Sequence, residues 1–233
     1  MNVGYINKRI FFILSSNGLF DTIFKDSNII CFYKKKYYLT YPISSMYKRK
    51  DFISLITTKC KYINHKLPRF GLINRLDYLS IGILIFCINP CYYNSLIYYY
   101  KNKLIKKYYI TIVNGLFPQF LNSYCGFHIS KKKVLRKGNS ILTNFTRFSY
   151  FKSGNRYYSI LVCITSTGKY HQLRDQLRIE GYNIISDSKN CKKKYFFLQF
   201  FMVNINNVLI KVPLDFLFLK LISRLSFNKK TYI

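Results

Sequence analysis

Residues 71–86, with the sequence GLINRLDYLSIGILIF, constrain the fold more than any other stretch. Residues 83–86 form a short apolar run directly after Gly82, a pattern that predicts a buried strand. Arg75 and Asp77 come just before it, on a predicted loop. Loops positioned by a rigid scaffold often carry catalytic groups, and the chain has only eight acidic residues. Asp77 is therefore a candidate functional residue.

The charge of the chain favours a polyanionic partner. Its 233 residues suffice for one domain, or for one domain with a small appendage, and half of them are hydrophobic. A formal net charge of +30 favours RNA, DNA or an acidic membrane surface. Codons rich in A and T also produce abundant Lys, Asn, Ile, Tyr and Phe, so the charge alone does not identify the partner.

The seven cysteines indicate no disulfide framework. An odd number of scattered cysteines favours a reducing, intracellular compartment, and no clear targeting segment identifies which one, so an organelle stays open. Cys87 and Cys91 are the only close pair, and core thiols are predicted there, because just three histidines are available to complete a zinc site. Neither a metal nor another cofactor is expected.

Hydrophobic periodicity predicts the remaining elements. Strands are expected at residues 10–14, 27–33, 109–113 and 157–164, and two more within 195–212. Helices are expected at residues 44–58, 92–104 and 171–180, with a closing helix from Pro213. Helix 44–58 is basic and amphipathic, with Met46, Phe52, Leu55 and Ile56 on its apolar side, and is either a solvated surface helix or an RNA contact.

Two further stretches bear on partners. The uncharged run 78–100 is long enough to span a bilayer, but Asn89-Pro90 breaks it, so strand, turn and helix are expected instead. Residues 130–156 are polar and basic and predict hairpins with flexible tips. A cluster of cations there is dense enough to contact phosphate, or is simply solvated: Lys131, Lys132, Lys133 and Arg136.

The sequence around Asp77 resembles a family signature. Arg75-Leu76-Asp77 alone is a common tripeptide, also typical of a surface turn with a short-range ion pair. Together with Asn74, Ser80 and Gly82, however, it is similar to the His-Arg-Leu-Asp-x-x-Thr-Ser-Gly block of the RluA-type pseudouridine synthases, whose Asp is catalytic.

Two later blocks fit the same family in the same order. Residues 167–174, with the sequence TGKYHQLR, resemble its Thr-Gly-Arg-Thr-His-Gln-Ile-Arg block, and Asp187 continues the pattern. Helical spacing predicts His171, Arg174 and Arg178 on one face. Residues 107–115 are similar to its Lys-x-Tyr-Leu-Ala-Leu-Val-x-Gly block, whose active-site tyrosine would be Tyr109. The family also has a Lys-Pro-Ala-Gly-Leu segment, and this chain matches it only at Lys34 and Pro42.

The resemblance implies an α/β (α+β) fold: a mixed, largely antiparallel sheet flanked by helices, with a central RNA cleft. The catalytic domain would cover residues 26–220. Residues 1–25 would be an N-terminal extension or a first strand, and residues 221–233 a basic tail. No room is expected for the small N-terminal S4-type RNA-binding domain that many relatives carry.

The activity implied is isomerisation of specific uridines to pseudouridine in structured RNA, with rRNA favoured over tRNA. Asp77 would be the catalytic carboxylate, as nucleophile or as base. Arg174 would pair with Asp77 and keep it ionised, while Tyr109 would stack on uracil or relay a proton. Arg75 would occupy the space left by a flipped-out base, and Lys169 and His171 would contact RNA.

Four departures from the family pattern leave the level of activity open: Asn74, Ile81, Lys169 and Ser186. The alternative is a catalytically silent RNA-binding relative that acts in ribosome assembly. A basic protein on an anionic membrane would need a strongly amphipathic helix, and none stands out. The chain is expected to be a monomer, with RNA as its partner and with neither a membrane nor an obligate protein partner.

Overall fold

The computed structural model describes residues 21–42, 51–125, 128–130, 133–135, 141–187 and 196–226. The chain divides into two compact units. Unit 1 comprises Met1–Lys107 and Phe200–Val212, and unit 2 comprises Tyr108–Gln199 and Pro213–Ile233.

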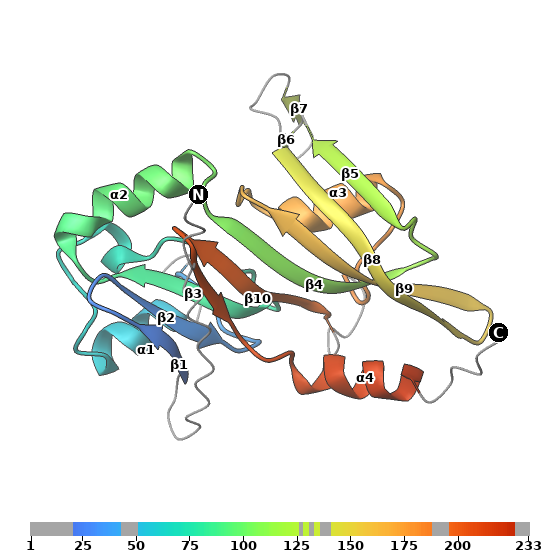
Figure 1. The fold of residues 1–233 in the computed structure, drawn as a ribbon, viewed down its shortest axis with the longest axis horizontal. Coiled ribbons are helices and arrows are strands. Elements are labelled where there is room, and N and C mark those ends of the chain that lie inside the picture. Colours follow the sequence, from blue (N-terminus) through green and yellow to red (C-terminus); the bar gives the residue numbers. More distant parts are fainter. Residues whose placement is uncertain are drawn as a thin grey trace, which may run out of the picture. The chain divides into compact units, whose positions relative to one another are not determined.

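Unit 1 is built on a sheet in which neighbouring strands follow the order β1-β2-β3-β10, with β11 paired to β10 (Figure 1). The β1–β2, β2–β3 and β10–β11 pairs are antiparallel. The strands are β1 (Asp21–Lys25), β2 (Ile29–Lys34), β3 (Ile81–Cys87), β10 (Leu198–Ile205) and β11 (Val208–Lys211). The helices are α1 (Phe52–Lys59), α2 (Pro90–Lys101) and the 3-10 turn η1 (Pro68–Gly71).

Strand β3 is the centre of unit 1, and the predicted buried strand is confirmed. All seven of its residues are buried, as expected for a strand covered on both faces. Gly82 lets β10 approach closely, because a Cβ at this position would lie 2.1 Å from the carbonyl oxygen of Phe200. The φ of Gly82 is 126°, a conformation that glycine adopts readily and other residues rarely do. The β2–β3 register places Lys34 opposite Gly82, which brings the end of β2 to the loop before β3.

Unit 2 contains strands in the order β4-β9-β8-β5, and β6 and β7 form a separate antiparallel hairpin (Figure 1). The β5–β8 and β8–β9 pairs are antiparallel. The strands are β4 (Lys106–Asn114), whose first two residues belong to unit 1, β5 (Phe120–Cys125), β6 (His128–Ser130), β7 (Lys133–Leu135), β8 (Ile141–Ser153) and β9 (Arg156–Thr165). The helices are α3 (Gln172–Ile179) and α4 (Phe216–Ser226).

Most predicted elements are confirmed, and the errors lie at helix starts. The helix expected from residue 44 begins at Phe52, because Asp51 is extended and its side chain accepts a hydrogen bond from Ser54 N as the N-cap. The closing helix begins at Phe216 rather than at Pro213, since Asp215 accepts from Leu217 N at 3.0 Å. The strand expected at residues 10–14 and the side chain of Met46 lie outside the described residues.

The apolar run 78–100 forms β3 and α2, with Asn89 as the N-cap of α2, as predicted. Among the described residues, no helix combines the length and hydrophobicity needed to cross a membrane. Cys87 is a buried thiol in β3, but Cys91 is exposed in the first turn of α2, so the prediction of two core thiols is wrong for Cys91.

Candidate active site

The loop before β3, residues 73–80, carries Arg75 and Asp77, and we call it the Asp77 loop. Asn74, buried at its start, donates through Nδ2 to Ile83 O at 3.0 Å and accepts from Ile85 N at 2.9 Å. The side chain at the position of the family histidine therefore ties the loop to β3.

Leu76, between the two charged residues, is held by a threonine from a distant part of the sequence. The hydroxyl of Thr40 donates to Leu76 O at 2.7 Å and accepts from Leu76 N at 3.0 Å. Thr40 and Leu76 are both buried, whereas Arg75 is exposed and Asp77 is half-buried. The backbone is thus fixed at Leu76 while the side chains on either side of it reach solvent.

Lys34, the last residue of β2, holds the far half of the Asp77 loop. Its side chain is fully buried, and Nζ donates to the carbonyl oxygens of Asp77 at 3.0 Å and Ser80 at 2.7 Å, with a longer contact to Tyr78 at 3.4 Å. Burial lowers the pKa of Lys34 to about 7, and the charge of Asp77 opposes part of that change. The weak sequence match at Lys34 therefore marks a residue that positions the backbone of Asp77.

A second buried lysine lies beside Tyr100. Lys107 is 1% exposed, and its Nζ lies 4.6 Å from the centre of the Tyr100 ring. Burial lowers the pKa of Lys107 to about 7. Burial raises the pKa of Tyr100, and the positive charge of Arg75 opposes that rise. Tyr109, two residues further along β4, is half-buried in unit 2.

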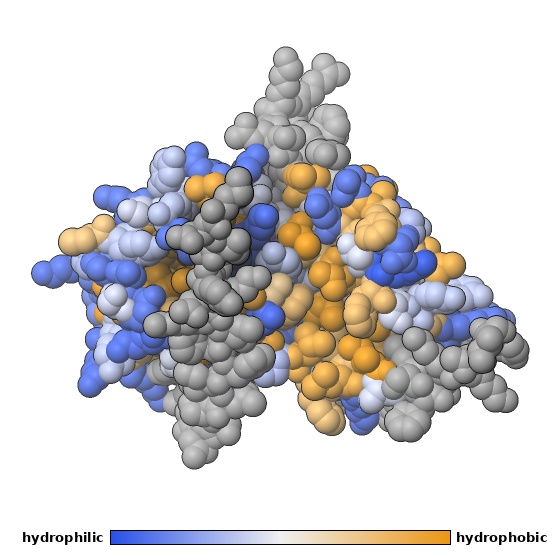
Figure 2. Space-filling view, viewed as in Figure 1, coloured by the Kyte–Doolittle hydropathy of each residue, from blue (hydrophilic) through white to orange (hydrophobic). Residues whose placement is uncertain are grey.

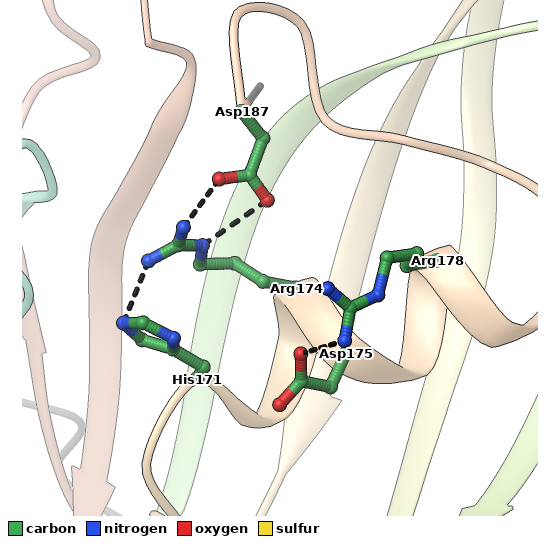
Figure 3. Close-up of polar contacts among 5 residues, drawn as sticks. All are labelled: His171, Arg174, Asp175, Arg178 and Asp187. Atoms are coloured by element: carbon green, nitrogen blue, oxygen red, sulfur yellow. Dashed lines mark hydrogen bonds and ion pairs between the residues drawn. The ribbon is translucent and has the colours of Figure 1, made fainter. Parts of the chain in front are cut away.

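Unit 2 contains the second polar centre, His171, Arg174 and Asp187, which we call the Arg174 cluster (Figure 3). Arg174 donates two hydrogen bonds to Asp187, from Nε to Oδ2 at 3.1 Å and from Nη2 to Oδ1 at 2.5 Å. Its Nη1 lies 2.7 Å from His171 Nε2. Because a guanidinium can only donate, this contact assigns His171 as a neutral imidazole with its proton on Nδ1.

One prediction about α3 is corrected. His171 has φ 52° and ψ 21°, so it precedes the helix in a left-handed conformation and is not its first helical residue. Arg178 pairs with Asp175 at 2.8 Å, and Figure 3 shows these two residues apart from the Arg174 cluster. Arg178 lies four residues after Arg174 in α3, which is compatible with the predicted shared face, but its side chain bonds Asp175.

Gln172 was missed as a positioning residue, although it stands in the family block. Its Oε1 accepts from Thr167 Oγ1 at 2.8 Å and from Lys169 N at 3.1 Å. Its Nε2 donates to Thr143 and Thr165 at 2.9 Å each. Gln172 is buried, so it fixes the turn that presents Lys169, Tyr170 and His171.

The predicted RNA-contact residues are only partly described. Lys169 is exposed, and the neighbouring Tyr170 is 62% exposed and stacks on His171 with ring centroids 3.7 Å apart. Lys133 belongs to β7. Lys131, Lys132 and Arg136 lie outside the described residues.

Asp77 belongs to unit 1, and Tyr109 and Arg174 belong to unit 2. The Asp77–Arg174 ion pair and the central RNA cleft stay predictions. In the part of the chain that the structure describes, no group of three or more His, Cys, Asp or Glu side chains is placed to hold a metal ion.

A family model described as RNA pseudouridylate synthase matches residues 28–178, a range that includes the Asp77 loop, β4 and Arg174. The chain belongs to the RNA pseudouridylate synthase family. The resemblance seen in its sequence blocks is thereby confirmed.

Curated relatives agree with this family. The ribosomal large subunit pseudouridine synthase D of Borreliella burgdorferi is 30% identical over 176 residues, which cover 71% of this chain and 52% of that protein. The ribosomal large subunit pseudouridine synthase C of Buchnera aphidicola is 32% identical over 176 residues, covering 63% of this chain and 54% of that protein. The chain thus spans about half the length of the curated relatives it matches.

Solved structures of family members share the fold. Human RNA pseudouridylate synthase domain containing 4 superposes with a TM-score of 0.66 at 13% identity, over 88% of this chain and 93% of that chain. Human RNA pseudouridylate synthase domain containing 1 gives 0.65 at 12% identity, over 92% and 86%. The predicted fold class, a mixed, largely antiparallel sheet with helices, is confirmed.

Proposed function

We propose that this protein isomerises specific uridines to pseudouridine in ribosomal RNA, with Asp77 as the catalytic carboxylate. The Asp77 loop carries the proposal: the buried side chains of Lys34 and Thr40 bond its backbone, the buried Asn74 ties it to β3, and Arg75 and Asp77 extend from it. A carboxylate that must meet one atom of a bound sugar benefits from such preorganisation. The names of the relatives favour rRNA over tRNA.

The reaction explains why a carboxylate is needed and why no redox group is called for. The bond between C1′ and N1 of uridine breaks, the uracil turns, and a bond forms between C1′ and C5. N1 gains a proton and C5 loses one, so the isomerisation is balanced without another reactant. Asp77 would act either as a nucleophile toward the ribose or as a base, and both roles require its ionised form.

Arg174 is proposed to keep Asp77 ionised. A guanidinium favours the charged form of a nearby carboxyl group and stays protonated itself. Its bonds to Asp187 and His171 would fix its direction. Tyr109 would stack on the uracil or relay a proton.

The RNA contacts are proposed on both units. Arg75, exposed on the Asp77 loop, would fill the space left when the target uridine flips out of the RNA. Lys169 and His171 would contact the RNA beside the site. The basic run that contains Lys131, Lys132, Lys133 and Arg136 would add phosphate contacts.

Pseudouridine mapping of rRNA and tRNA with Asp77→Asn tests this function. The substitution preserves shape but removes the charge, so pseudouridine formation should fall to background while RNA binding and the unfolding midpoint are retained. Asp175→Asn is the matched control, since it removes a half-buried carboxylate whose ion pair is with the exposed Arg178 on the same helix. Control activity should stay within about twofold of wild type.

Full activity of Asp77→Asn would overturn the proposed mechanism. A wild-type protein that binds rRNA but forms no pseudouridine in rRNA or tRNA would favour the alternative, a catalytically silent relative acting in ribosome assembly. Asn74→His and Lys169→Arg would then restore two family residues and test whether these departures cause the silence.

A further inference from the structure

We propose that the β8–β9 hairpin is a binding site for single-stranded RNA, formed by four side chains on one face: Arg147, Tyr150, Lys152 and Tyr157. We call this set the tyrosine–cation ladder. The inference rests on the proposed function in one respect, since it takes RNA as the substrate class and adds where unpaired nucleotides of that RNA would lie.

Strand register explains why these side chains share a face. In an antiparallel pair, residues opposite each other point to the same side. Lys152 lies opposite Tyr157, and Tyr150 lies opposite Ser159, two residues along from Tyr157. A register shift between Arg147 and Ser149 bulges Phe148 outward, and it returns Arg147 to the side of Tyr150.

The distances along the ladder place two neighbouring rings between two cations. The guanidinium carbon of Arg147 lies 5.1 Å from the centre of the Tyr150 ring. The Tyr150 and Tyr157 ring centroids are 6.5 Å apart, and Lys152 Nζ lies 5.7 Å from the centre of the Tyr157 ring. Arg147 also donates to Phe117 O, which anchors that end of the ladder to the body of unit 2.

The ladder is open to solvent. Tyr150 is 53% exposed and Tyr157 is 42% exposed, and the bulged Phe148 beside them is 66% exposed. In Figure 2 the orange body of unit 2 gives way to blue residues toward the end of this hairpin, at the right of the view. Exposed aromatic rings flanked by cations are therefore concentrated on the distal part of the hairpin, residues 147–158, in which no residue is buried.

Charge favours RNA as the occupant. The hairpin segment 147–158 contains three cations and no acidic residue, and no Asp or Glu occurs anywhere between Asp77 and Asp175. Single-stranded RNA supplies both complements: bases that stack on tyrosine rings and phosphates that pair with cations. Arginine and lysine beside the rings add cation–π attraction to the same bases.

The test measures binding of the full-length protein to a short uridine-rich single-stranded RNA and to an RNA duplex of equal length. The double variant Tyr150→Leu, Tyr157→Leu should weaken single-strand binding about tenfold or more, since it removes the stacking surfaces. Tyr150→Phe, Tyr157→Phe should retain wild-type affinity, because the rings remain. Lys152→Gln should lower the salt slope of binding by about one.

Tyr98→Leu, a 59% exposed tyrosine on α2, is the matched control and should bind as wild type. Unchanged single-strand affinity in the double Leu variant would overturn the inference, as would an equal loss for the duplex. Loss of binding to a protein partner, with RNA affinity unchanged, would assign the ladder to protein recognition instead. Ladder-dependent binding by an inactive wild type would refute the proposed function alone, and full activity with ladder-independent binding would refute this inference alone.

Discussion

The Asp77 loop and the Arg174 cluster hold their key side chains by different means. In the loop, the buried Lys34 and Thr40 bond the backbone around Asp77, and the buried Asn74 bonds the backbone of β3. In the cluster, Arg174 is held through its side chain, by an ion pair whose two side chains are 22% and 19% exposed.

This difference should decide whether a substitution lowers only the activity or the free energy of unfolding as well. Buried backbone groups that lose a donor cost free energy because nothing replaces the bond, so damage to the loop should affect folding and activity together. An ion pair whose side chains are about one-fifth exposed is still partly screened by water and salt, so it should contribute less to folding than the fully buried bonds of Lys34. Damage to the cluster should therefore affect activity with little change in stability.

The largest effect is expected for Lys34→Met, which removes the donor shared by the carbonyl groups of Asp77 and Ser80. Activity should fall by roughly 100-fold, because the catalytic carboxylate loses its position. The free energy of unfolding should fall by about 3 kcal/mol as buried carbonyl groups lose their partner. Turnover assays and chemical denaturation measure both quantities.

Lys35→Met is the control for that variant. The neighbouring lysine is exposed and pairs with Asp21 at 3.3 Å, so both quantities should stay near wild type. Wild-type activity in Lys34→Met would break the comparison, since the loop would then hold Asp77 without its buried donor.

Two buried lysines of unit 1 should determine how the free energy of unfolding changes between pH 7 and 9. Burial lowers the pKa of Lys34 and Lys107 to about 7, from an ordinary value of 10.5. Between these values the unfolded chain binds more protons than the folded chain, so the free energy of unfolding rises with pH. From pH 7 to 9 the rise should be up to about 2 kcal/mol for each lysine.

Denaturation at several pH values measures this rise. Lys34→Met and Lys107→Met should each flatten it, whereas Arg174→Lys should not, because the group stays charged throughout. Above pH 9 the buried thiols of Cys31, Cys87 and Cys163 should oppose this rise, since burial raises their pKa and the unfolded chain loses those protons first. A flat profile from pH 7 to 9 in the wild type would contradict the buried-lysine account.

The smallest change in stability is expected for Asp187→Asn, which weakens the two bonds to Arg174. The free energy of unfolding should change by less than about 1 kcal/mol. Activity should fall by about tenfold if Arg174 acts on Asp77, because its guanidinium loses direction. Asp175→Asn again serves as the control, and a large loss of stability in Asp187→Asn alone would show that the cluster is structural.

The sequence predicted those parts of the fold that leave a local signal. Strand β3 was predicted from an apolar run after Gly82, and β10 and β11 from a turn at Asn206-Asn207. Helix starts were predicted less well, because one side chain decides them: Asp51 caps α1, and His171 adopts a left-handed conformation before α3. The hydrophobic periodicity of α1 and α3 does not indicate the cap at Asp51 or the left-handed conformation of His171.

The sequence by itself determined the family, the candidate carboxylate and the strand that follows it, because those depend on residue types at fixed short spacings. Only the tertiary structure decided what holds the site. Lys34 and Thr40 reach the Asp77 loop from about 40 residues away, through the β2–β3 register and the turn that follows β2. A hydrogen bond between such distant residues depends on how the strands pair. The local sequence around each of the two residues carries no pattern that predicts this pairing.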